Sequence, residues 1–120
     1  TSTHLGNPLG CAAALAVLRT LEAESLLRRA DEAGARFLAR LGKQVGGSSR
    51  VRALRGRGLL VAVELDDAAF ARELGGALLR TGWIALGEGP ENRTLALTPP
   101  LGIAESLCEA FADRLGELVR

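Results

Sequence analysis

Apolar residues recur at steps of three and four in four long stretches of the chain, which is the spacing of one face of an α-helix. The first stretch, residues 8–22, is apolar almost all round until Arg19, so the helix that it predicts should be covered on most sides. In isolation one face of that helix would be bare, which suggests that a neighbour is missing. Three further helices, each with one buried stripe, are expected over residues 26–45, 68–81 and 104–119.

The starts of these helices carry signals of different strength. Ser25 can cap the second helix and Asp66-Asp67 can start the third, whereas the last helix begins without a good capping side chain. The side chains expected to face inward on the last three helices are Leu27, Ala30, Gly34, Phe37, Leu38, Leu41, Val45, Phe70, Leu74, Ala77, Leu78, Leu107, Phe111, Leu115 and Leu118.

A two-residue alternation over residues 59–65 predicts the best strand of the chain. A bend at Gly56-Arg57-Gly58 separates it from a short strand at residues 51–54, and two more strands are expected at 83–86 and 93–98. Strands and helices mix without strict alternation. This order favours an α+β fold, with a small and mainly antiparallel sheet covered by helices on one face and a long connecting helix at the N-terminus.

Composition and charge limit the kinds of molecule that the chain is expected to bind and the compartment in which it is expected to occur. The chain has 120 residues, which is one domain's worth, and a formal net charge of +1, which offers no field for steering towards nucleic acid or an anionic membrane. No secretory signal and no apolar run of membrane-spanning length is visible. Cys11 and Cys108 both lie in apolar helical patterns, so each is expected to be a small buried thiol in a reducing, cytoplasmic compartment.

Groups with catalytic chemistry are few. His4 is the only histidine, and Lys43, the only lysine, lies near the end of an amphipathic helix, where a solvated charge is expected rather than a Schiff-base amine. Glu64 should either face solvent or pair with an arginine across the sheet. No metal-ligand spacing, nucleophile elbow or phosphate-binding loop is present. The chain alone is therefore not expected to be catalytic.

Polar residues precede the helix that is predicted over residues 8–22. Asn7 is a good N-cap and Pro8 suits the first helical position. Two interpretations remain open. The segment is either a capped helix after a polar turn, or a helix start whose backbone donors and positive dipole end bind an anion such as a phosphate.

Three blocks of sequence resemble one enzyme family. Residues 2–14, STHLGNPLGCAAA, are similar to the S-T-x-x-G-N-P-L-x-C-A-A-A segment of class III pyridoxal-phosphate aminotransferases, the acetylornithine and ornithine aminotransferase group. Residues 55–65, RGRGLLVAVEL, resemble the family's R-G-x-G-L strand, and residues 95–103, LALTPPLGI, resemble its P-P-L-x-I strand end. The blocks lie in the family's order and cover the C-terminal third of such an enzyme.

The resemblance implies a division of the chain and an activity. Residues 1–24 would be the cofactor-phosphate loop and the helix linking from a large domain that is missing here, and residues 25–120 the C-terminal small domain of a fold-type I enzyme. The full-length enzyme would transfer an amino group between an amino acid or amine and a 2-oxo acid through pyridoxal 5'-phosphate. The cofactor lysine, the aspartate paired to the pyridine nitrogen and the stacking aromatic ring all belong to the large domain, so the fragment alone should be inactive.

The resemblance also implies two binding residues. By motif, Thr3 contacts the cofactor phosphate of the neighbouring subunit, and Ser2 touches substrate or phosphate, so the site needs a homodimer. Small-molecule amino donors and 2-oxo acids are the expected partners, with no nucleic acid and no membrane.

One position departs from the family pattern. Many relatives that act on α-amino acids carry an arginine three residues before the first proline of the P-P-L block, and here that position is Ala96. Arg93 lies at an odd offset and should point to the opposite face of a regular strand. Either the carboxylate is held elsewhere, or the substrate is not a standard α-amino acid. The alternative to the enzyme is a non-catalytic α+β interaction or regulatory domain that retains the fold.

Overall fold

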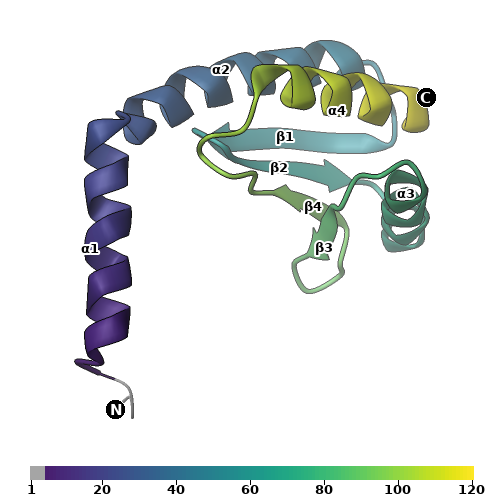
Figure 1. The fold of residues 1–120 in the computed structure, drawn as a ribbon. Helices are drawn as coiled ribbons and strands as arrows, with labels where there is room; N and C mark the ends of the chain where they lie inside the picture. The colour runs from purple at the N-terminus through teal and green to yellow at the C-terminus, as the bar shows by residue number, and fades with distance from the viewer. Residues whose placement is uncertain (1–4) are drawn as a thin grey trace.

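A computed structural model describes residues 5–120 of the chain and contains the four predicted helices and a four-stranded sheet (Figure 1). In chain order the elements are α1 Pro8–Ala23, α2 Leu26–Val45, β1 Val51–Arg57, β2 Leu60–Leu65, α3 Ala68–Arg80, β3 Leu86–Glu88, β4 Thr94–Leu97 and α4 Glu105–Leu118.

The sheet is antiparallel throughout, with the strand order β1-β2-β4-β3. Helices α2 and α4 lie over one face of it, and α3 packs beside β2 and β3 (Figure 1). Val61 and Val63 point into the covered face and are buried, whereas Leu60, one residue out of phase, is 62% exposed. The predicted α+β fold with helices on one face of a small antiparallel sheet is confirmed.

The core is aliphatic, as the composition indicates, with a small aromatic cluster at one end. Phe111 contacts Phe37 and Trp83 edge to face, with ring centroids 6.2 Å and 5.4 Å apart. No polar or charged residue is buried among those that the structure describes. Burial of apolar side chains between the sheet and the helices is therefore the main source of stability.

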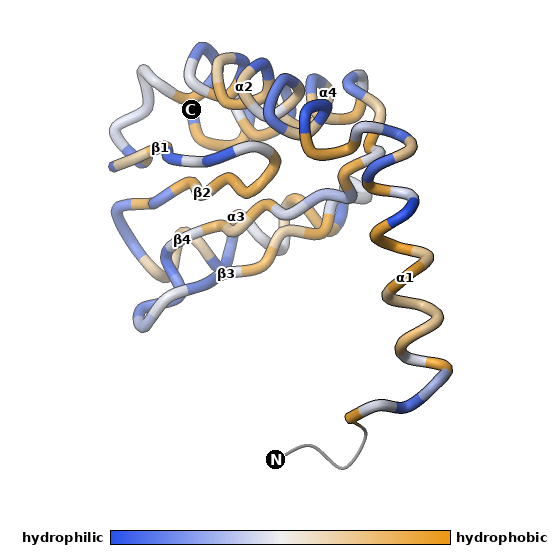
Figure 2. The backbone as a smooth tube through the Cα atoms, turned by 90° about the vertical axis from the view of Figure 1, so that its left-hand side faces the viewer, coloured by the Kyte–Doolittle hydropathy of each residue, from blue (hydrophilic) through white to orange (hydrophobic). Residues whose placement is uncertain are grey.

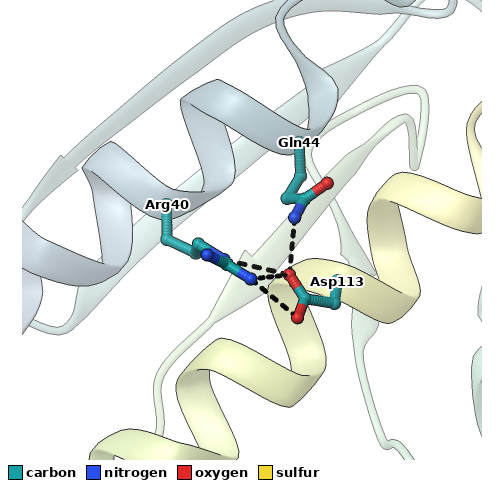
Figure 3. A network of polar contacts seen from close by, with 3 residues as sticks. All are labelled: Arg40, Gln44 and Asp113. Carbon is teal, nitrogen blue, oxygen red and sulfur yellow. Dashed lines mark hydrogen bonds and ion pairs between the residues drawn. The ribbon is translucent and has the colours of Figure 1, made fainter.

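Polar contacts join α2 to α4 along their outer edge. Arg40 donates to both carboxylate oxygens of Asp113, with nitrogen–oxygen distances of 2.6 Å and 2.8 Å, and the Gln44 amide donates to the same carboxylate at 2.6 Å (Figure 3). Nearer the start of α4, Arg36 pairs with Glu105. These contacts align two helices that are far apart in the sequence.

Three predictions about individual side chains are wrong. Ser25 adopts a left-handed conformation, with φ of 49°, and makes no capping bond, because it forms the elbow between α1 and α2. Leu27 is 67% exposed, since the buried stripe of α2 begins one residue earlier at Leu26. Leu107 is 50% exposed, and the next residue of α4, Cys108, is the buried one.

Two strand boundaries also differ from the prediction. Trp83 is not in a strand, because its backbone N–H donates to Leu78 at the end of α3, so β3 begins only at Leu86. Strand β1 continues through the glycine that was expected to bend it, and Arg57 still pairs with Leu60. The chain reverses at Gly58 instead, where φ of 53° favours glycine.

Helix α1 stands away from the rest of the fold. It has no buried residue, although it is apolar along most of its length (Figure 2). The prediction that one of its faces would be bare is confirmed. Cys11 is consequently exposed, so its predicted burial is wrong, whereas the prediction holds for Cys108.

Candidate functional site

The start of α1 is the first candidate site. The Asn7 side-chain oxygen accepts from the backbone N–H groups of Leu9, at 2.9 Å, and Gly10, at 3.4 Å, and Pro8 occupies the first turn. The helix is therefore capped by its own chain, which agrees with the first of the two interpretations. An anion at this point would have to compete with Asn7 for those donors. Ser2, Thr3 and His4 lie outside the described residues.

The second candidate site is the face of the sheet that no helix covers. Strand register brings Ala62, Ala96 and Leu86 side by side on this face, with Arg55 next along on β1. Ala96 is thus at the centre of an uncovered surface, where a longer side chain would project away from the core. The sequence predicted its strand but not its neighbours, which come from three other strands.

The guanidinium of Arg93, near this surface, is already paired with carboxylates. Its guanidinium lies 3.2 Å from the carboxylate of Glu91 and 3.6 Å from that of Glu64. The Arg55 guanidinium donates to Glu64 at 2.7 Å, and this hydrogen bond is the main cause that lowers the pKa of the Glu64 carboxyl. Glu64 is therefore ionised and paired with arginines, which confirms the expectation of a pair across the sheet. A carboxylate held in this way is a poor proton acceptor.

Comparison with protein families identifies the family to which this fold and its candidate sites belong. Residues 1–119 match the family described as aminotransferase class-III. The chain belongs to the class III aminotransferase family.

Relatives of known name match nearly the whole chain. The acetylornithine aminotransferase of Gloeobacter violaceus is 44% identical over 121 residues, which cover 99% of this chain and 30% of that protein. The 4-aminobutyrate aminotransferase of Mycobacterium leprae is 33% identical over 124 residues, covering 98% of this chain and 28% of that protein. The solved ornithine δ-aminotransferase of Plasmodium falciparum is 33% identical with a TM-score of 0.88, covering 99% of this chain and 30% of that one. The chain thus spans less than a third of the length of these relatives.

Class III aminotransferases depend on pyridoxal phosphate, and the described residues offer little to hold it. Lys43 is exposed in the last turn of α2. No cluster of three or more potential metal ligands exists within residues 5–120. Among residues 5–120, no helix is both long enough and apolar enough to cross a membrane.

Proposed function

We propose that this chain is the C-terminal part of a pyridoxal-phosphate-dependent aminotransferase, which transfers an amino group between an amino acid or amine and a 2-oxo acid. The observation that carries this proposal is the family match across residues 1–119, which extends over almost all of this chain but less than a third of its relatives. A site completed elsewhere also accounts for the lack of catalytic groups within residues 5–120.

The proposed division lies at the elbow after α1. Residues 1–24 would form the cofactor-phosphate loop and a connecting helix, and residues 25–120 the small domain. The exposure of every residue of α1 except the half-buried Leu21 supports this, because an apolar helix gains stability only when other chain covers it. From α2 onward the chain has its own core. We further propose that the enzyme is a cytoplasmic homodimer.

Thr3 is proposed to hold the cofactor phosphate of the neighbouring subunit, and Ser2 the substrate or the same phosphate. A hydroxyl and the backbone N–H groups of a loop suit an oxyanion. The capping of α1 by Asn7 supports a contact from the loop before the helix, since the amides of Leu9 and Gly10 are already engaged. When bound, the cofactor supplies an electron sink for the amino-transfer chemistry.

The proposed substrate class depends on the alanine at position 96. With alanine there and Arg93 paired to carboxylates, no free guanidinium on β4 faces a substrate carboxylate. We therefore propose either that the carboxylate is held by residues outside this chain, or that the substrate lacks a standard α-amino acid carboxylate at that point. An amine or an ω-amino acid fits the second case.

The first test is the intact mass of the expressed protein together with amino-transfer assays. A mass near three times that of these 120 residues, with transfer from amines or amino acids to a 2-oxo acid, is expected. A mass equal to that of the chain would overturn the proposal in favour of a non-catalytic interaction domain.

The second test addresses Thr3. The substitution Thr3→Ala should raise the Kd for pyridoxal phosphate about tenfold or more, because a hydrogen bond to a charged group contributes about 1.5–3 kcal/mol. Thr1→Ala, the same change two residues earlier, is the matched control, since the motif assigns it no contact. Equal cofactor affinity in both variants, measured by absorbance titration of the full-length enzyme, would remove Thr3 from the site.

A further inference from the structure

Two arginines lie on the same face of the edge strand β1. Arg55 and Arg57 are two residues apart, so an extended strand places both side chains on the face of the sheet that no helix covers. Their partners in register on β2 are Ala62 and Leu60, which lie on that face as well. The rise of a strand sets the two arginine Cα atoms about 6.7 Å apart, a spacing that lets both guanidinium groups reach one ligand.

An open hollow of about 250 Å³ lies beside these arginines and is lined by residues 55–57 and 60–62. Its only charged lining groups are the two guanidinium groups, because the remaining residues are glycine, leucine, valine and alanine. The hollow around residues 88–94 differs, since three glutamates line it besides two arginines. A hollow that contains positive charge alone attracts an anion.

Both arginines have N–H donors that the described chain leaves unused. Within residues 5–120 no ion pair joins Arg57 to a carboxylate, although Asp31 borders a second hollow beside it. Arg55 donates through Nη1 to Glu64 at 2.7 Å. That bond orients the Arg55 side chain and leaves other N–H groups of its guanidinium, which has five, for a ligand.

The backbone that carries Arg57 is held in place. Gly58 directly after it reverses the chain with a φ of 53°. Helix α2 packs against this turn at Gly34 so closely that no side chain larger than hydrogen fits there without a shift of the backbone. Because the turn fixes the start of the Arg57 side chain, a ligand has to order only that side chain when it binds.

We propose that Arg55 and Arg57 form a binding site for a phosphate group, either inorganic phosphate or the phosphate of a small ester. Guanidinium groups match the oxygens of a phosphate in charge and in hydrogen-bond geometry, and two positive charges suit a dianion. The exposed Leu60 side chain beside them offers an apolar contact to the rest of an ester. The hollow is smaller than the pockets that hold drug-sized molecules, so the ligand is small. This site goes beyond amino transfer and does not depend on that activity.

The test measures the Kd for inorganic phosphate by ³¹P NMR titration of the full-length protein at low salt. The protein is first saturated with pyridoxal phosphate and freed of the excess, so that the cofactor site is filled. Arg57→Gln should raise this Kd at least tenfold, because a hydrogen bond between charged groups is lost. Arg52→Gln is the matched control, since Arg52 is an exposed arginine on the same strand that does not line the hollow.

Two results would overturn the proposal. An unchanged Kd in Arg57→Gln would mean that this side chain does not bind phosphate. An equal rise in both variants would show a general attraction to a basic strand rather than a site.

A second titration with phenyl phosphate distinguishes the two sources of the phosphate group. Tighter binding than that of inorganic phosphate, lost in Leu60→Gln, would assign the site to an ester, and equal binding would assign it to free phosphate. Both assignments support the site only if Arg57→Gln weakens binding of the same probe. Amino-transfer activity is assayed on the same samples, so that a failure of the proposed function is recorded separately from a failure of the phosphate site.

Discussion

Gly34 lies in the middle of α2, at the point where that helix meets the turn between β1 and β2. A Cβ atom at this position would lie 2.0 Å from the carbonyl oxygen of Gly58 and 2.6 Å from its Cα. Both obstacles are backbone atoms, so no side chain can rotate away. The variant Gly34→Ala must therefore push the helix or the turn back by about 1.4 Å to reach an ordinary contact of 3.4 Å.

Two opposing effects set the size of the change. Alanine favours a helix over glycine by about 1 kcal/mol, which stabilises the variant. Overpacking of a well-packed interior costs typically about 1–3 kcal/mol, and a clash with backbone belongs at the upper end of that range. The net expectation for Gly34→Ala is a loss of about 2 kcal/mol, which corresponds to a melting temperature lower by roughly 8 °C for a chain of this size.

Gly42, two turns later on the same helix, is the matched control. An added Cβ there meets nothing closer than the Leu54 methyl carbon at 3.8 Å, so Gly42→Ala should gain about the full 1 kcal/mol of helix propensity. Urea denaturation followed by far-ultraviolet circular dichroism measures both variants against the wild type. The reasoning fails if Gly34→Ala is as stable as Gly42→Ala, because the helix would then not press on the turn.

Three further variants test other parts of the structure. Asp113→Ala should cost about 1 kcal/mol or less, because its pair with Arg40 is half exposed, and the loss measured by denaturation should shrink in 1 M salt. Asp67→Ala should lower stability at neutral pH. The Phe70 N–H bond holds the pKa of the Asp67 carboxyl below its usual 3.8, so the cap stabilises above that pH, and its contribution is lost as the pH falls through the lower folded value in denaturation curves. In the full-length enzyme, Ala96→Arg should raise kcat/KM for α-amino acids relative to amines without a carboxylate, and an unchanged ratio would place substrate recognition elsewhere.

The regular elements could be predicted because local rules and tertiary packing agree on them. Residues 59–65 alternate with a two-residue period, and the same period is seen in the buried Val61 and Val63 beside the exposed Leu60. The stripe of Phe37 and Leu41 on α2 follows the helical period in the same way. Wherever one face of an element is buried, the pattern of side chains records that face.

The errors occur where a tertiary contact overrides a local preference. Ser25 is a good capping residue in isolation, but the reversal between α1 and α2 requires a left-handed residue there, and its side chain cannot reach the first turn. Trp83 has strong strand propensity, yet its N–H completes the end of α3 and its ring packs on Phe111. Neither constraint is visible in a window of neighbouring residues.

The two cysteines show why the site was harder to predict than the fold. Cys11 and Cys108 lie in equally apolar patterns, yet only Cys108 is buried within the described chain. A hydrophobic pattern records the burial of a residue in the whole protein, whereas the structure of one part shows only the contacts within that part. Pattern and structure therefore disagree at α1, which has no buried residue, and at Ile84, an apolar side chain that is 81% exposed. In the proposed enzyme the additional polypeptide that the relatives possess would cover such apolar surfaces, so a structure of the matched region alone leaves them exposed.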